Sequence, residues 1–256
     1  MRTKRLFLVS FVAILVPLVA SCGAASGGEA AGSGDIVVFA ASSLTDAFTD
    51  LAAAFNVVNP DAKVTFNFSG SSELVTQISQ GAPADVFVSA DDTNMKKLAA
   101  AGEVAGDPVA IAKNTFQIIV ENGNPQGITG LADLAKPGLV VVLCAETVPC
   151  GQGAAKILKN SNVTMTPKSL EDRVKGVVAK VTAGEADAGI VFATDVQAAG
   201  DKAVGVEIPT DVNVVTNYPM AVTKEAPNAA LAQVFIDFVS ASQGQAILAK
   251  YGFLAP

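Results

Sequence analysis

The stretch IVVFAASSLTD, from Ile36 to Asp46, decides the fold class of this chain. Its first half is an apolar run rich in β-branched residues, which is typical of a strand buried on both faces. Its second half has the form of a helix start, because Ser43 is followed three residues later by an acidic side chain. A buried strand that runs directly into a helix is the repeating unit of α/β proteins.

The same alternation of strand and helix patterns continues toward the C-terminus. We expect further strands at the apolar or alternating stretches 63–68, 85–88, 116–120, 139–143, 188–192 and 218–222. Helical patterns fall between them, over about 43–56, 71–80, 93–101, 151–159, 170–183 and 229–250. This order predicts open, mostly parallel sheets flanked by helices. A chain of this length exceeds the usual size of a single core, so we expect two lobes.

Residues 1–21 have the order and length of a signal peptide, with a basic start, an apolar run and a few small residues. The apolar run is too short for a comfortable membrane span. The sequence LVASC, which ends at Cys22, resembles the lipobox of bacterial lipoproteins, where the cysteine is lipidated and becomes the new N-terminus. Ordinary cleavage nearby without a lipid is the alternative. Residues 22–34 are mostly Gly, Ala and Ser, as in a flexible tether, so we expect an extracytoplasmic protein anchored to the outer face of the cell membrane through Cys22.

The balance of charges excludes one class of partner. Three of the 17 basic residues lie in the signal peptide, which leaves 14 basic and 24 acidic residues and a net charge of −10. Nucleic acid is not an expected partner, because its recognition requires clustered Lys and Arg. An acidic protein also does not attract anions through its overall field, so any bound anion must be held by local dipoles.

The chain contains three cysteines and no histidine. If Cys22 carries a lipid, Cys144 and Cys150 remain as one pair, and a disulfide is permitted outside the cell. A zinc site is the alternative, but two thiols without histidine cannot fill the usual four ligand positions, so no metal is expected. The absence of histidine also excludes His-based acid–base and triad chemistry, which argues against an enzyme on this fold.

Known nucleotide-binding motifs are not present. Gly151-Gln152-Gly153 follows an expected strand, yet it lacks the third glycine of a dinucleotide fingerprint and the Gly-Lys-Ser/Thr of a P-loop. We interpret this stretch as a tight turn between a strand and a helix, and we expect no cofactor.

A pair of serines follows an expected strand and opens an expected helix twice, at Ser42-Ser43 and at Ser71-Ser72. In open α/β sheets, ligands bind at the carboxyl ends of strands, close to helix N-termini. Helix N-termini offer free N–H groups and partial positive charge, so they bind anions. Ser43 and Ser71 would add hydroxyl donors there. The alternative is that each serine only caps its helix.

Six short motifs follow one another along the chain after the tether. They are Phe39–Leu44, Gly70–Leu74, Gly81–Asp91, Val148–Gly151, Ala188–Phe192 and Tyr251–Phe253. In this order they resemble the molybdate-binding proteins of ABC importers. The resemblance implies a two-lobed, hinged solute-binding fold of the type II periplasmic-binding kind. It also implies that lobe one spans residues 35–114 plus 223–256, that lobe two spans residues 115–222, and that the ligand lies in the cleft.

The resemblance further implies a site of hydrogen-bond donors alone, made of two serine hydroxyls, two backbone N–H groups and one tyrosine hydroxyl. The corresponding positions are Ser43, Ser71, the N–H groups of Cys150 and Val174, and Phe192. Phenylalanine has no hydroxyl, so one donor is missing. We weigh three consequences of the missing hydroxyl: a lower affinity, a bound water in its place, or a donor from Tyr218 or Thr194. A disulfide between Cys144 and Cys150 would fix the loop that presents the Cys150 N–H.

A donor-only site suits molybdate, a tetrahedral dianion whose oxygens carry no protons and can only accept. Phosphate retains a proton that would face another donor, which is unfavourable. Sulfate is excluded only by size, and tungstate is nearly identical to molybdate. We therefore expect a monomer that captures molybdate or tungstate and delivers it to the permease of an ABC transporter. A receptor for another oxyanion such as sulfate, or a sensory lipoprotein on the same fold, is the alternative.

Overall fold

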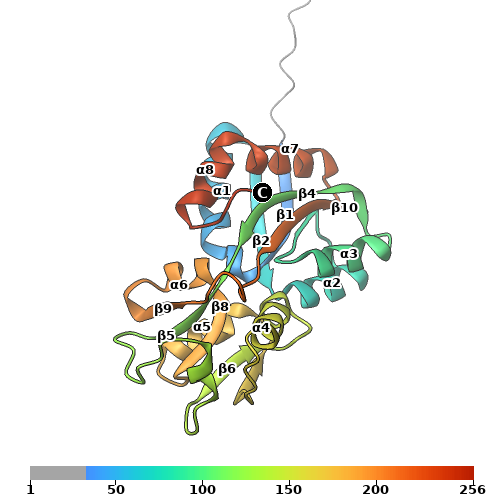
Figure 1. Cartoon of the computed structure of the whole chain (residues 1–256). Coiled ribbons are helices and arrows are strands. Elements are labelled where there is room, and N and C mark those ends of the chain that lie inside the picture. Colours follow the sequence, from blue (N-terminus) through green and yellow to red (C-terminus); the bar gives the residue numbers. More distant parts are fainter. Residues whose placement is uncertain (1–32) are drawn as a thin grey trace, which may run out of the picture. The chain divides into compact units, whose positions relative to one another are not determined.

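The computed structural model describes residues 33–256, which form two five-stranded sheets flanked by helices (Figure 1). The signal peptide, the lipidated Cys22 and nearly all of the tether expected from the sequence lie outside the described residues. Among the described residues, no helix combines the length and the apolar character needed to cross a lipid bilayer. The same part of the chain has no cluster of three or more His, Cys, Asp and Glu side chains that could hold a metal ion.

The first sheet is built mainly from the N-terminal part of the chain. Its strands are β1 (Gly34–Ala41), β2 (Ala62–Ser69), β3 (Val86–Val88), β4 (Val104–Asn114) and β10 (Thr216–Thr223). They lie in the order β2-β1-β3-β10-β4. The flanking helices are α1 (Thr45–Val58), α2 (Ser71–Ser79), α3 (Asp92–Ala100), α7 (Ala229–Ser240) and α8 (Ser242–Lys250), and a 3-10 turn, η1 (Ser42–Leu44), connects β1 to α1.

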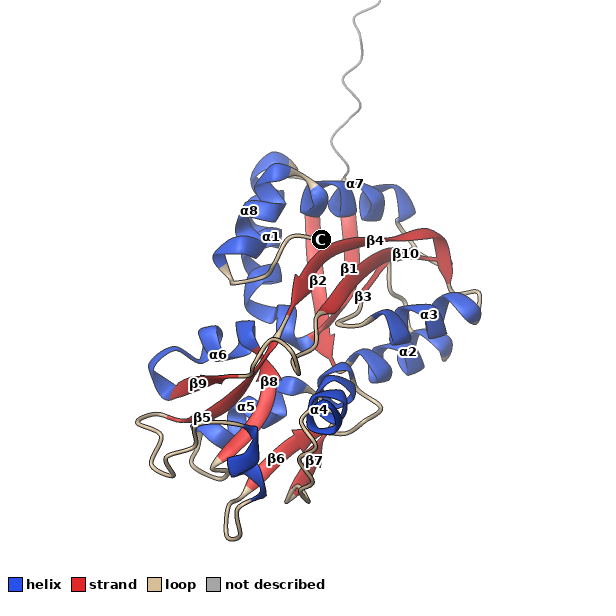
Figure 2. Cartoon of the chain, viewed as in Figure 1, coloured by secondary structure: helices blue, strands red, loops and turns tan. Residues whose placement is uncertain are grey.

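Side chains of β1 alternate between the two faces of this sheet, as the period of a strand requires. Ile36 and Val38 belong to the larger hydrophobic core, which also contains Phe48 of α1. Phe39 points to the opposite face and packs in a second cluster with Leu74 of α2. Figure 2 shows the result, in which α1, α7 and α8 cover one face of the sheet and α2 and α3 cover the other. The starts of η1, α2 and α3 follow closely on the carboxyl ends of β1, β2 and β3.

The second sheet has the same number of strands. They are β5 (Phe116–Glu121), β6 (Val141–Cys144), β7 (Ser169–Glu171), β8 (Ala188–Phe192) and β9 (Ala203–Glu207), in the order β7-β6-β8-β5-β9. The accompanying helices are α4 (Pro149–Asn160), α5 (Val174–Thr182), α6 (Ala193–Ala199) and the short 3-10 segments η2 (Leu131–Ala135) and η3 (Gly200–Lys202). The expected two-lobed α/β fold is confirmed.

The sheets are mixed rather than mostly parallel, because each contains two parallel and two antiparallel pairings. In the first sheet the reason is the route of the chain, since β4 leaves this sheet for the second one and β10 returns (Figure 1). Strands that leave and return run in opposite directions, so β4 and β10 pair antiparallel. The pairing assigns Thr216–Thr223 to the first sheet, whereas the range expected for lobe two extends to residue 222.

Several elements differ from the sequence-based expectation. The long C-terminal helical pattern is divided at Ala241, where the backbone is extended, into α7 and α8. This tight break is possible because Gly244 lies against the carbonyl oxygens of Phe238 and Val239, where a side chain would collide. Similarly, the expected helix over 170–183 begins only at Val174, because the preceding residues pair with β6 as a strand.

Candidate functional site

One cavity contains all five residues that the sequence analysis assigned to the site. It is lined by Ala41, Ser42, Ser43, Ser69, Gly70, Ser71, Ala90, Val148, Pro149, Cys150, Arg173, Val174 and Phe192. The first seven come from strand ends and helix starts of the first sheet, and the others come from those of the second sheet. The site is thus assembled from both sheets, and none of its lining residues is acidic.

Neither of the two predicted serines caps its helix, although both lie at helix starts. The N-cap positions of α1 and α2 are Leu44 and Gly70, and neither helix has a side-chain capping bond. The capping box expected from Ser43 to Asp46 is therefore not formed, because Ser43 lies in the 3-10 turn that precedes α1. Capping does not explain either serine.

The oxygen of Ser71 is already occupied as an acceptor. The backbone N–H of Ala90 donates to Ser71 Oγ over 3.1 Å. A backbone N–H can only donate, so the hydroxyl hydrogen of Ser71 needs an acceptor elsewhere. Ser71 is buried and lines the cavity, so an acceptor in the cavity would satisfy its hydroxyl.

Helix starts from the second sheet supply the backbone donors. Cys150 is the second residue of α4 and Val174 is the first residue of α5. N–H groups in the first turn of a helix have no partner within the helix, and the helix dipole adds partial positive charge there. Both residues line the cavity. These donors therefore suit an anion.

A disulfide joins Cys144 at the end of β6 to Cys150 in the first turn of α4. The pairing expected from the sequence is present, and it closes the short loop that leads into α4. Gly151 lies directly against the carbonyl oxygen of Ala145, at a distance that leaves no room for a side chain. Gly151 is part of α4 itself, so the interpretation of Gly151–Gly153 as a turn between strand and helix was wrong.

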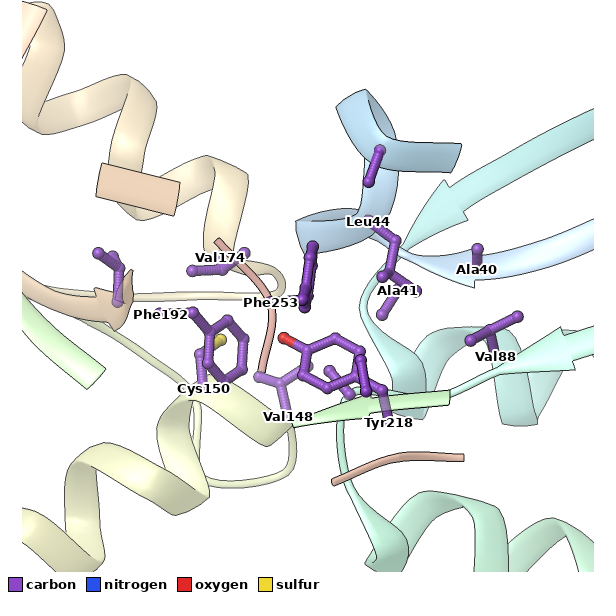
Figure 3. Close-up of a cluster of buried hydrophobic side chains, with 14 of the residues drawn as sticks. Ala40, Ala41, Leu44, Val88, Val148, Cys150, Val174, Phe192, Tyr218 and Phe253 are labelled. Atoms are coloured by element: carbon purple, nitrogen blue, oxygen red, sulfur yellow. The ribbon is translucent and has the colours of Figure 1, made fainter. Parts of the chain in front are cut away.

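Phe192 lines the cavity at the position where the family resemblance implies a tyrosine. Its ring packs against Phe116, with 4.7 Å between ring centroids, and against Tyr218 at 5.9 Å. Tyr218 and Thr194, the proposed replacements for the missing hydroxyl, are buried but are not among the described residues that line the cavity. Figure 3 shows the ring of Tyr218 next to those of Phe192 and Phe253.

Two lining residues carry information that the sequence analysis missed. Arg173 lines the cavity although it was not among the residues expected there, and its guanidinium lies 3.5 Å from the neighbouring Asp172 carboxylate. Gly70 lies so close to the other lobe that an added Cβ would be 2.2 Å from the carbonyl oxygen of Asp172. The sequence shows the glycine but does not predict its contact across the cleft, because that contact depends on how the two lobes meet.

A buried carboxylate lies outside the cavity lining. Asp195, in the first turn of α6, is almost fully buried, and neither of its oxygens has a hydrogen-bond partner among the described residues. Its nearest cation is Lys175, at 3.6 Å. Burial raises the pKa of Asp195 to about 6. Lys175 also pairs across the cleft with Asp46 of α1 at 3.0 Å.

A cavity between two lobes, lined by helix starts and serine hydroxyls and free of acidic groups, defines a two-lobed protein that binds a small solute. The family of bacterial extracellular solute-binding proteins matches residues 36–254. The chain belongs to this family, which places it among binding proteins rather than enzymes.

Similar proteins cover nearly the whole chain. The molybdate-binding protein ModA of Mycobacterium tuberculosis (strain ATCC 25618 / H37Rv) is 43% identical over 249 residues, or 95% of each chain. The molybdate-binding protein ModA of Escherichia coli (strain K12) is 33% identical over 247 residues, covering 90% of this chain and 93% of the relative. Among solved structures, the periplasmic molybdate-binding protein of Azotobacter vinelandii matches with a TM-score of 0.74 and 20% identity, covering 86% of this chain and 99% of that chain. The last likeness concerns the fold alone.

Proposed function

We propose that this protein captures molybdate in the cavity between its lobes and delivers it to an ABC transporter in the membrane. The observation that carries the proposal is the donor set, because two serine hydroxyls and two N–H groups at helix starts converge on one cavity without acidic lining residues. The proposed ligands are Ser43, Ser71, and the backbone N–H groups of Cys150 and Val174, with Phe192 closing the pocket. The identity to molybdate-binding relatives supports the same ligand.

Local dipoles can hold an anion here despite the acidic character of the chain. Three helices, α2, α4 and α5, direct their N-termini toward the cavity, since Ser71, Pro149, Cys150 and Val174 line it. Each N-terminus carries roughly half a positive charge. Arg173 adds a cation that is partly compensated by Asp172. The arrangement therefore favours a dianion without any metal or titratable ligand.

The chemistry of the donors bears on which oxyanion binds. Every proposed ligand donates, and the Ser71 oxygen already accepts from Ala90. An oxyanion without protons satisfies such donors, whereas a protonated one would leave its own hydrogen unpaired at a cost of about 1–3 kcal/mol. We expect tungstate to bind as well, because it presents the same four acceptors.

Two further parts of the proposal concern the state and location of the protein in the cell and the residue boundaries of its lobes. We propose that the protein acts as a monomer, without a cofactor, held outside the cytoplasm by lipid on Cys22. For the lobes, we propose that lobe one contains residues 33–114 and 216–256, so that the second crossing precedes β10. The strand pairing of β10 supports this boundary.

Calorimetric titration of the purified protein with molybdate, tungstate, sulfate and phosphate tests the proposal. We expect tight binding of the first two anions and binding of sulfate and phosphate that is weaker by at least about a hundredfold. A protein that prefers sulfate would be a receptor for a different oxyanion. The absence of binding to molybdate and tungstate would contradict the proposed function.

A further inference from the structure

A series of buried hydrogen bonds connects Ser43 to three residues that do not line the cavity, Tyr218, Asn114 and Thr194. The oxygen of Ser43 is 3.0 Å from the hydroxyl oxygen of Tyr218. The side-chain amide of Asn114 donates to Tyr218 Oη at 3.4 Å and to Thr194 Oγ1 at 2.8 Å. All four side chains are buried, and of the four only Ser43 lines the cavity.

The direction of these hydrogen bonds follows from Asn114. Its carbonyl oxygen accepts from the N–H of Thr115 at 3.0 Å, so its amide nitrogen faces Tyr218 and Thr194. An amide NH₂ group can only donate, so Tyr218 accepts from Asn114 and must donate its own hydrogen elsewhere. Ser43 Oγ is the acceptor that the described residues provide. A buried hydroxyl hydrogen without an acceptor would cost about 1–3 kcal/mol, which favours donation from Tyr218 to Ser43.

We propose that Tyr218 is a positioning residue that makes Ser43 a donor to the bound oxyanion. Because Tyr218 donates to Ser43 Oγ, the serine hydrogen turns away from the tyrosine and toward the cavity. Hydrogen bonds in such a chain polarise one another, which strengthens the donation from Ser43. This inference rests on the proposed function of the cavity. It gives Ser43 the same arrangement as Ser71, whose oxygen accepts from the Ala90 N–H.

The proposed role of Tyr218 does not involve direct contact with the ligand. Tyr218 has no exposed surface and does not line the cavity, so its hydroxyl acts through Ser43 rather than replacing the donor absent at Phe192. Burial raises the pKa of Tyr218 far above its usual range, so the hydroxyl keeps the proton that it donates. The tyrosine ring is held by the aromatic rings of Phe192 and Phe253, which fix the position of its hydroxyl.

Tyr218→Phe in the full chain tests the proposal, with affinity for molybdate measured by calorimetry. We expect binding weaker by roughly threefold to tenfold, because one supporting hydrogen bond is lost. If Ser43 instead donated to Tyr218, removal of the hydroxyl would release the serine, and the affinity would stay unchanged or increase. Either of these results would overturn the proposal. Tyr251→Phe is the matched control, since the other tyrosine of the chain bonds to Asp50 and does not line the cavity.

A double-mutant cycle separates positioning from a general structural role. In a Ser43→Ala background, Tyr218→Phe should weaken molybdate binding by less than about twofold, because the group it orients is gone. Independent, additive losses would contradict the positioning role. If Tyr218→Phe fails to fold, Asn114→Leu serves as the second variant. It keeps the tyrosine hydroxyl but removes the donor that sets its direction, so molybdate binding should again weaken, and unchanged binding would contradict the proposal.

The same titrations distinguish this inference from the proposed function. A wild-type protein that does not bind molybdate contradicts the proposed function itself. Wild-type binding that Tyr218→Phe leaves unchanged contradicts only the role of Tyr218.

Discussion

Ser43 and Ser71 lie at helix starts, where serine is a favoured cap, yet neither hydroxyl bonds to its own helix. The sequence predicts where these serines lie, because a buried strand followed by a helix start is a local pattern. It could not decide between capping and ligand binding. For Ser43 that choice depends on Tyr218, which lies 175 residues further along the chain. For Ser71 it depends on Ala90, which lies 19 residues further along.

Ser43→Ala and Ser71→Ala each remove one proposed donor to the anion. A hydrogen bond to a charged group contributes about 1.5–3 kcal/mol, so we expect molybdate affinity to fall by roughly tenfold to a hundredfold in each variant. Denaturant unfolding of the ligand-free variants should show a folded protein destabilised by about 1–3 kcal/mol, because the hydroxyl of Tyr218 or the N–H of Ala90 loses its buried acceptor. Unchanged affinity in either variant would remove that serine from the site.

Asp195 predicts a specific dependence of stability on pH. Its pKa rises from 3.8, the ordinary value of an aspartate side chain, to about 6 in the folded protein, so the folded state binds more protons between these values. Its contribution to stability is therefore fully present below about pH 4 and is lost as the pH rises through about 6. Relative to Asp195→Asn, the wild-type protein should lose roughly 3 kcal/mol of unfolding free energy over this range.

Denaturant unfolding of both proteins at pH 4, 5, 6 and 7 checks this prediction, and the quantity compared is the difference between their unfolding free energies. A difference that does not change with pH would mean that the folded protein does not raise the pKa of Asp195.

At the scale of helices and strands, the strands inside the sheets were predictable, whereas of the edge strands β2, β4, β7 and β9 only β2 was. β1 and β8 are continuous apolar runs because they lie inside their sheets. β4 lies at the edge of the first sheet, and six of its residues in succession, 105–110, are exposed. Its Gly106 and Pro108 are turn-forming residues that an edge strand tolerates. The sequence pattern therefore contains no signal for this strand.

The disulfide at the start of α4 predicts an effect of redox state on binding. Reduction should lower the unfolding free energy by about 2 kcal/mol, the value expected for closing a short loop. It should also weaken molybdate binding, because the segment from Cys144 to Cys150 would no longer hold the Cys150 N–H in place. A variant with both cysteines changed to Ala is the control, since dithiothreitol should not alter its affinity. Equal affinities of the oxidised and reduced wild-type protein would contradict the role of the disulfide.

At the scale of the whole molecule, the two lobes meet closely around the cavity. Gly70 in the first lobe faces the backbone of Asp172 in the second, and Lys175 of the second lobe pairs with Asp46 of the first. The family motifs predict two lobes and a cleft. They do not predict these contacts, because residues 70 and 172 become neighbours only when the complete fold brings the lobes together.

Gly70→Ala should prevent the lobes from reaching the observed separation. The backbone of Gly70 has φ −65°, which alanine adopts without strain, so the ligand-free protein should keep its stability. The new methyl group would collide with the Asp172 carbonyl oxygen, so we expect molybdate affinity to fall by at least about tenfold. Gly130→Ala is the control, because nothing lies within 4 Å of its added Cβ. Wild-type affinity in Gly70→Ala would show that binding does not require this close approach.

A crystal structure of the protein grown with molybdate, with the metal located by its anomalous scattering, tests the central claim most directly. The proposed site predicts one molybdenum atom in the cavity, with its oxygens within hydrogen-bond distance of Ser43 Oγ, Ser71 Oγ and the backbone nitrogens of Cys150 and Val174. An anion bound elsewhere, or one that contacts a carboxylate instead of these four donors, would contradict it.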